Sequence, residues 1–80
     1  MKARVTVTLK NTVLDPQGQA IYQAASRLGF NGVRAVRQGK VFDLELNGLS
    51  EEQAREQVER FAQEVLTNPV IEEFHYELED

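Results

Sequence analysis

Residues 9–18 read LKNTVLDPQG, and they join a strand pattern to a helix pattern. Just before the junction, Val5, Val7 and Leu9 alternate with polar residues, which is the period of two expected for a strand with one buried face. Asp15 can accept hydrogen bonds from the free amides of a first helical turn, and Pro16 has the backbone angle favoured at the first helical position. The stretch therefore predicts a strand over 2–10 and a helix that begins at about residue 16.

The predicted helix over 16–28 carries an apolar stripe at helical spacing, made of Ile21, Ala24, Ala25 and Leu28. Gly29 can take the left-handed conformation that ends a helix, and Phe30 can pack back over the last turn. Gly18 is not explained by capping. A glycine inside the first turn gives up roughly 1 kcal/mol relative to alanine, which indicates that another group approaches the backbone closely there.

Residues 33–37 and 41–47 predict a β-hairpin with a two-residue turn at Gln38-Gly39, where glycine would supply the positive φ that such turns need. The register that this turn imposes places Arg37 opposite Lys40. A shift by one residue would put Arg37 on the core face, which costs too much to be favoured. The favoured register gives one shared core face, made of Val33, Ala35, Phe42, Leu44 and Leu46.

The second half of the chain predicts one more helix and one more strand. Ser50-Glu51-Glu52-Gln53 is a capping-box signature, and Asn68-Pro69 ends the helix that follows it. Its apolar stripe consists of Ala54, Val58, Phe61, Ala62, Val65 and Leu66. A strand then begins at Val70 or Ile71, with Phe74, Tyr76 and Leu78 on one face and Glu73, His75, Glu77 and Glu79 on the other.

The order βαββαβ predicts an α+β, ferredoxin-like (split βαβ) fold over the single domain 1–80. In that fold a four-stranded antiparallel sheet carries both helices on one face. We expect the spatial strand order 70–79, 2–10, 41–47, 33–37. The other face of the sheet is predicted to be bare and mostly polar, so we expect a homodimer or higher homo-oligomer, formed through sheet edges or by stacking of this bare face.

The composition of the chain excludes some kinds of site and argues against some kinds of partner. The 80 residues carry a net charge of -4 and contain no cysteine, which excludes disulfides and thiolate metal sites. Residues 1–40 hold seven Lys or Arg and one acid, whereas residues 41–80 hold two Arg and twelve acids. This acidic balance argues against nucleic acid as the main partner and permits charge-complementary contacts with protein. With no apolar run long enough for a membrane span and no signal-like segment, we expect no membrane association and a cytoplasmic location.

The sequence contains few residues in an arrangement that could carry out catalysis. His75 stands among carboxylates without a nucleophile, and a single imidazole is too little for a zinc or iron site. Ser50 is explained by capping, and Ser26 has no histidine in register. The chain also lacks a phosphate-binding glycine loop. We therefore expect no catalytic, cofactor-binding or metal-binding residue on this chain.

The residues left for a function lie around the first junction and the predicted hairpin turn. Asp15, Gln17, Gly18, Arg37 and Lys40 are candidates for a partner interface. Two other interpretations remain open: Gly18 can serve a contact within its own domain or oligomer, and Arg37 and Lys40 can simply solvate an exposed turn.

Several motifs together resemble those of the PurS family, the small auxiliary subunit of phosphoribosylformylglycinamidine synthase. They are Leu9-Lys10, Val13 to Gly18, Leu28-Gly29-Phe30, Val36 to Lys40 and Asn68 to Glu72. The resemblance implies a non-catalytic subunit of a ligase complex that makes formylglycinamidine ribonucleotide in purine synthesis. It implies two partners, an ATP-dependent synthetase subunit and a glutaminase subunit. It implies ATP and Mg²⁺ for the complex and no cofactor on this chain.

Two other functions share the expected fold. A ferredoxin-like regulatory module would bind a small ligand at an oligomer interface, but only analogy of fold supports it. An acylphosphatase-like hydrolase would need a basic, anion-binding loop after the first strand, and Asn11-Thr12-Val13-Leu14 supplies no arginine there.

Overall fold

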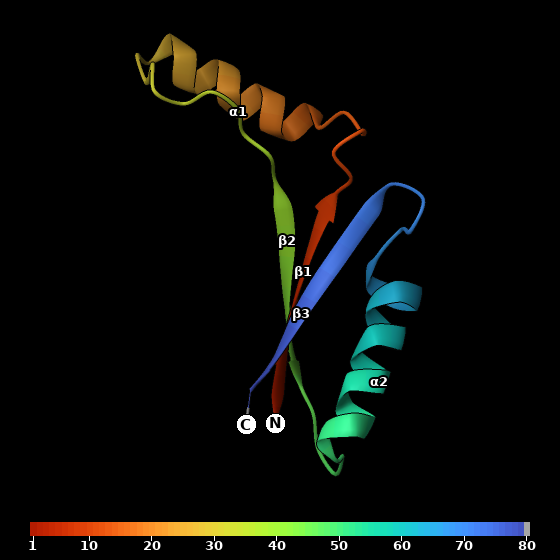
Figure 1. The fold of residues 1–80 in the computed structure, drawn as a ribbon. Helices are drawn as coiled ribbons and strands as arrows, with labels where there is room; N and C mark the ends of the chain where they lie inside the picture. Colours follow the sequence, from red (N-terminus) through yellow and green to blue (C-terminus); the bar gives the residue numbers. More distant parts are fainter. Residues whose placement is uncertain (80) are drawn as a thin grey trace.

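The computed structural model describes residues 1–79. The elements in chain order are β1 (Lys2–Leu9), α1 (Pro16–Arg27), β2 (Gly39–Glu45), α2 (Glu51–Phe61), a π-helical turn η1 (Ala62–Leu66) and β3 (Glu72–Glu79). β1 lies in the middle of an antiparallel sheet with the order β2-β1-β3 (Figure 1). Among the described residues, no helix is long and apolar enough to cross a membrane.

The core lies between one face of this sheet and α2. Val5 stands opposite Phe42 on β2 and Tyr76 on β3, so the predicted alternation brings the apolar side chains of three strands to one face. Val58 of α2 packs against the same cluster and is 1% exposed. The buried cluster is made of Ala3, Val5, Val7, Val58 and Ala62. The alternation predicted for β1, β2 and β3 is therefore confirmed.

Both helix starts follow the sequence prediction. The Asp15 side chain accepts a hydrogen bond from the Gly18 amide, and Pro16 begins α1. At α2 the capping box is complete, because the Gln53 amide donates to Ser50 Oγ over 3.2 Å and the Ser50 amide donates to Gln53 Oε1 over 3.0 Å. Gly29 has φ of 89°, as expected of a glycine that ends a helix.

The prediction of a four-stranded sheet is wrong. Residues 33–38 form no strand, and β2 begins directly at Gly39, which pairs with Thr8 of β1. The expected hairpin turn is absent, and Gly39 does not have positive φ. Instead, a Cβ on Gly39 would stand 2.8 Å from the carbonyl oxygen of Val7, so glycine is needed there for close strand approach. The other three strands keep the predicted order.

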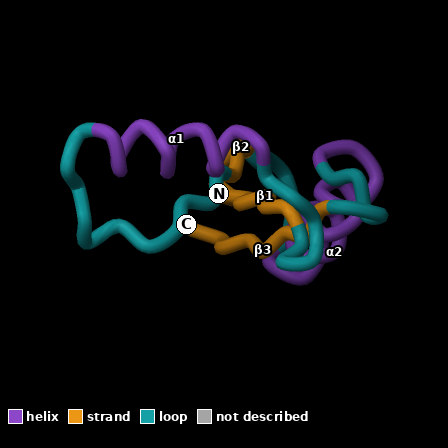
Figure 2. The backbone as a smooth tube through the Cα atoms, turned by 90° about the horizontal axis from the view of Figure 1, so that it is seen from above, coloured by secondary structure: helices purple, strands orange, loops and turns teal. Residues whose placement is uncertain are grey.

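The expectation that both helices cover the same sheet face is also wrong. α1 lies beyond one end of the sheet, and the segment 29–38 returns beside it, so that α1 and this segment form a projecting arm (Figures 1 and 2). No residue of α1 belongs to the core cluster. The Cα radius of gyration is 16.1 Å, whereas a compact chain of this length has about 12 Å. The arm, defined here as residues 14–38, is therefore not packed on the rest of its own chain.

Candidate partner-binding site

The five candidate residues of the sequence analysis meet where the arm joins the sheet. Asp15 organises this junction. Its Oδ1 accepts a hydrogen bond from the Gly18 amide over 3.0 Å, and its Oδ2 accepts one from the Gln38 amide over 2.8 Å. The carboxylate thus caps α1 and also holds the returning segment. Asp15 is 6% exposed, which marks it as part of the framework of the junction.

Gly18 is buried under that returning segment. A Cβ at this position would clash with the carbonyl oxygen of Val36 and would stand 2.7 Å from Asp15 Oδ2. The close approach inferred from the sequence is therefore present, and it comes from the chain itself. Glycine is required here because the backbone of residue 36 lies directly on the first turn of α1.

Arg37 ties the returning segment to the loop after β1. Its guanidinium donates to the carbonyl oxygens of Lys10 and Val13 over 3.0 and 3.2 Å. These bonds use the Arg37 side chain, and the Gln38 amide donates to Asp15, so both residues are anchored at the junction. The segment is consequently held against the junction, which explains why 33–37 does not form the predicted edge strand beside β2.

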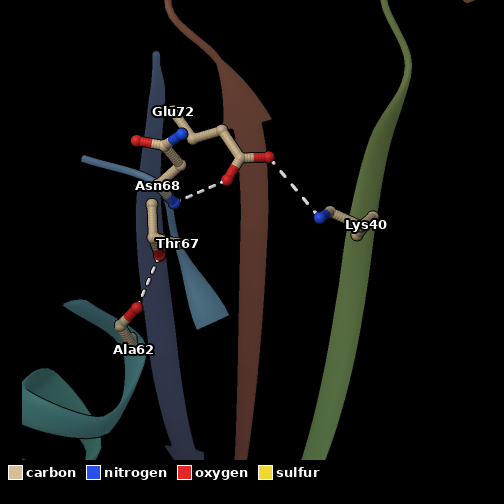
Figure 3. A network of polar contacts seen from close by, with 5 residues as sticks. All are labelled: Lys40, Ala62, Thr67, Asn68 and Glu72. Carbon is tan, nitrogen blue, oxygen red and sulfur yellow. Dashed lines mark hydrogen bonds and ion pairs between the residues drawn. The ribbon is translucent and has the colours of Figure 1, made fainter. Parts of the chain in front are cut away.

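Lys40 lies at the same end of the sheet and forms an ion pair across β1. Its Nζ is 3.5 Å from Glu72 Oε2, while Glu72 Oε1 accepts the Asn68 amide over 2.7 Å (Figure 3). The Lys40 side chain is 57% exposed and that of Glu72 only 14%. One nearly buried carboxylate therefore orients a lysine whose side chain is more than half exposed. Below it, the Thr67 hydroxyl donates to the Ala62 carbonyl of η1.

An open groove lies among these groups, with a volume of about 440 Å³. Its walls combine polar residues from the arm, β2 and β3 with two apolar residues of β1. The lining residues are Val7, Leu9, Asp15, Gln17, Gln38, Gly39, Lys40 and Glu72. Of the candidate residues, Asp15, Gln17 and Lys40 line the groove. Gly18 and Arg37 do not line it, but Gly18 donates to Asp15 and Arg37 binds the loop before Asp15.

Sequence reasoning missed two contributors to this groove. Glu72 was named only as part of a family motif. The feature that could have identified it is an acidic residue at the first position of a strand whose core face is otherwise apolar. Gln38 acts through its backbone amide, so no side-chain pattern could have revealed it.

The hydrogen bonds at the junction have an electrostatic consequence. The amides of Gln38 and Gly18 hold the pKa of the Asp15 carboxyl below its ordinary value. A lowered pKa in the folded state means that Asp15 stabilises the fold above its unfolded pKa of about 4, and that this contribution is lost as the pH falls through the folded-state pKa.

We expect Asp15→Asn to lower the thermal unfolding midpoint by several degrees near neutral pH, because an amide can accept from only one of the two backbone donors. The difference between the wild-type and variant midpoints should shrink below about pH 4, where the wild-type carboxyl becomes protonated. Circular dichroism melts across this pH range measure it. Asp43→Asn is the control, because its carboxylate pairs with Arg4 on the exposed sheet face. A midpoint difference independent of pH would contradict this role of Asp15.

The remaining polar groups indicate what kind of ligand or partner this surface could bind. Within residues 1–79, no cluster of three or more His, Cys, Asp or Glu could hold a metal ion. His75 is exposed on β3 opposite Thr6 and does not line the junction groove. What the groove offers is one accessible lysine, one amide side chain and hydrogen-bonded carboxylates. Such a surface suits recognition of a partner's polar groups.

Comparison with known proteins gives a consistent result over the whole chain. The family model PurS, phosphoribosylformylglycinamidine (FGAM) synthase, matches residues 2–80. A relative named phosphoribosylformylglycinamidine synthase subunit PurS from Methanocaldococcus jannaschii is 40% identical over 78 residues, covering 98% of this chain and 94% of the relative. The subunit of the same name from Bacillus subtilis is 38% identical, with 99% and 93% covered.

Solved structures agree with these matches. The M. jannaschii PurS crystal structure superposes with a TM-score of 0.88 at 38% identity, covering 99% of this chain and 95% of that one. A chain in the structure of PurLQS from Thermotoga maritima superposes with a TM-score of 0.87 at 32% identity, covering 95% and 93%.

Proposed function

This chain belongs to the PurS family of phosphoribosylformylglycinamidine synthase, and on that premise we propose that it is the non-catalytic subunit that assembles this ligase. Its partners are then the ATP-dependent synthetase subunit and the glutaminase subunit. The observation that carries the proposal is the family match over residues 2–80, supported by the similarity to a chain of a PurLQS structure. The complex would act in the cytoplasm in purine synthesis.

The reaction assigned to the complex joins glutamine-derived ammonia to formylglycinamide ribonucleotide, with ATP hydrolysis to ADP and phosphate. ATP and Mg²⁺ would belong to the synthetase subunit. The contribution of this chain is to hold the two larger subunits in the arrangement that lets ammonia pass between them.

The junction groove is the surface that we propose for contact with a larger subunit. Gln17 and Arg37 are exposed, and the Lys40 side chain in the groove wall is more than half exposed. Asp15 and Gly18 are buried and keep the groove in shape. Because a lysine held by a nearly buried carboxylate loses little conformational freedom on binding, it is well suited to pair with an acidic group of the partner.

Reconstitution tests the function. The synthetase and glutaminase subunits, mixed with glutamine, ATP, Mg²⁺ and formylglycinamide ribonucleotide, should form product at a much higher rate when this chain is added. An equal rate with and without the chain would reject the assembly role. Ammonia in place of glutamine serves as the control, because it bypasses the glutaminase.

We expect Lys40→Gln to weaken complex formation while leaving the isolated chain folded, because glutamine adds no like charge beside Glu72 and the Glu72 carboxylate keeps its hydrogen bond from the Asn68 amide. Lys2→Gln is the matched control, since Lys2 is an exposed lysine at the other end of the same sheet. Analytical ultracentrifugation of the reconstituted complex measures both variants. Equal binding by the two variants would remove the junction groove from the interface.

A further inference from the structure

The tip of the arm carries an asparagine followed directly by a glycine, the dipeptide Asn31-Gly32. It forms a turn between α1 and the returning segment, at the end of the arm that lies away from the sheet (Figure 1). Both residues are exposed, and no atom lies within 4 Å of the position that a Cβ on Gly32 would occupy. The dipeptide is therefore accessible to water and has open space beside the glycine.

An asparagine before glycine has a nucleophile next to its own side chain. The amide nitrogen of Gly32, once deprotonated, can attack Cγ of Asn31, because glycine has no side chain to hinder the approach. The bond from Cγ to Nδ2 breaks, ammonia leaves and a five-membered succinimide ring forms. Water then opens the ring, at the side-chain carbonyl to give aspartate or at the main-chain carbonyl to give isoaspartate. The sum of these steps consumes one water and releases one ammonia.

Little of the local structure opposes this reaction at Asn31. In the described part of the chain the Gly32 amide donates to no backbone carbonyl, so base can remove its proton. The bond that closes the turn, from the Val33 amide to the Phe30 carbonyl, is 3.3 Å long. No residue of the arm belongs to the core cluster, so the main chain at Asn31 can turn toward ring closure without unpacking the core.

The chain has a second asparagine-glycine pair, Asn47-Gly48, whose backbone is held on both sides. This pair lies between β2 and α2. On one side the Leu46 amide donates to the Met1 carbonyl over 2.9 Å, and the Leu46 side chain packs against the core. On the other side Ser50 is fixed in the capping box of α2. Ring closure at Asn47 therefore has to displace packed and capped neighbours, which makes this pair an internal reference.

The other two asparagines lack an unhindered nucleophile. Asn68 precedes Pro69, whose nitrogen carries no proton. Asn11 precedes Thr12, whose branched side chain crowds the attacking nitrogen. Of the four asparagines in the chain, Asn31 is the one that combines a following glycine with a backbone not anchored to the core or to a helix cap.

We propose that Asn31 is a site of spontaneous modification, at which the folded chain deamidates to aspartate and isoaspartate without an enzyme. The change adds a carboxylate to an arm that carries Arg27, Arg34 and Arg37 against the single acid Asp15. The contacts that hold the arm lie at the junction, at the other end of α1, so the modified chain keeps its fold and accumulates. This proposal concerns the isolated chain and does not depend on the proposed function, so the two can fail separately.

Peptide mapping of the aged protein tests the proposal. Trypsin, which cleaves after Lys and Arg, places Asn31 in the peptide 28–34 and Asn47 in the separate peptide 41–55. The folded chain and a sample unfolded in urea are incubated at mildly alkaline pH, and mass spectrometry follows the conversion of amide to carboxyl in each peptide. In urea the two sites should react at similar rates, because both precede glycine.

In the folded chain the two sites should separate. Asn31 should keep nearly its unfolded rate, whereas Asn47 should slow by about tenfold or more, as expected of a site that first needs a local opening of about 1.4 kcal/mol. Equal protection of the two sites in the folded chain would overturn the proposal, and so would faster conversion at Asn47 than at Asn31.

Gly32→Ala is the matched variant, because it keeps Asn31 and its Cβ would meet no atom within 4 Å. The added methyl group hinders the attacking nitrogen, so conversion at Asn31 should slow severalfold while Asn47 keeps its wild-type rate. A Gly32→Ala chain that loses the Asn31 amide as fast as the wild type would show that ring closure through residue 32 is not the route.

A second readout detects the isomerised product itself. A carboxyl methyltransferase that acts on isoaspartate, supplied with labelled S-adenosylmethionine, should transfer label to the peptide 28–34 of the aged wild-type chain. The Asn31→Gln chain, aged in the same way, should stay unlabelled in that peptide. The aged wild-type chain should also keep the thermal midpoint of the fresh chain by circular dichroism. Label mainly in the peptide 41–55, or a fall of the midpoint on ageing, would contradict the proposed site or its tolerance by the fold.

Discussion

Gly18→Ala is expected to destabilise this protein by about 2–4 kcal/mol, although the same change inside an ordinary helix stabilises by roughly 1 kcal/mol. The added Cβ would clash with the carbonyl oxygen of Val36 and crowd the Asp15 carboxylate. Relief of that clash would lift residues 36–38 from the junction and break the Gln38 hydrogen bond to Asp15. Thermal unfolding measures the loss, and amide exchange should place the largest gain in exchange rate at α1 and residues 36–38.

Gly32→Ala provides the matched control. No atom lies within 4 Å of the position that a Cβ on Gly32 would occupy, and its φ is not positive. This variant should match or slightly exceed the stability of the wild type, because alanine restricts the unfolded chain. A Gly18→Ala variant more stable than the wild type would show that Val36 does not lie against the first turn of α1 in solution.

Val5→Asp is expected to abolish folding. Val5 is completely buried at the centre of the sheet, between Phe42 and Tyr76 and beneath α2. An unpaired carboxylate at this position costs several kcal/mol. That cost is comparable to the whole stability of an 80-residue domain, about 4–12 kcal/mol. Far-ultraviolet circular dichroism at neutral pH should show a largely unfolded chain.

The neighbouring residue provides the control. Thr6 lies on the other face of β1, opposite Val41 and His75, and is only partly buried. Thr6→Asp should therefore remain folded with a modest loss of stability. A folded Val5→Asp variant, or equal losses at the two positions, would mean that the register of β1 differs from the one described.

Much of the secondary structure could be predicted from the residues because its determinants are local. The Asp15 cap, the Ser50–Gln53 box and the left-handed Gly29 each depend on atoms a few residues apart. The alternation of β1, β2 and β3 identifies their buried faces without knowledge of their partners. The family motifs, including residues 13–18, were likewise readable from the chain.

The error at residues 33–37 has a definite cause. Val33 to Arg37 alternates like a strand, but its backbone and side chains have competing partners about twenty residues earlier in the sequence. Val36 lies on Gly18, Arg37 binds the carbonyls of Lys10 and Val13, and the Gln38 amide binds Asp15. The periodicity of a short segment depends only on its own residues and carries no information about these distant contacts. It therefore predicted a hairpin that the fold does not form.

The residues of the candidate site were predicted from the sequence, but their common location in the fold was not. The sequence suggested Asp15, Gln17, Gly18, Arg37 and Lys40 for separate reasons, and only the fold brings them to one end of the sheet. The fold also separates their roles, because Asp15 and Gly18 are buried while Gln17, Arg37 and Lys40 are accessible.

The junction at residues 9–18 illustrates this division. By itself the sequence determined where β1 ends and how α1 begins, since caps and periodicity act between near neighbours. Only the tertiary structure decided where α1 goes: the helix projects from the sheet, because the returning segment is pinned at its first turn by contacts across more than twenty residues. Those contacts leave Ile21 and Leu28 of the apolar stripe exposed, which residue patterns alone do not reveal.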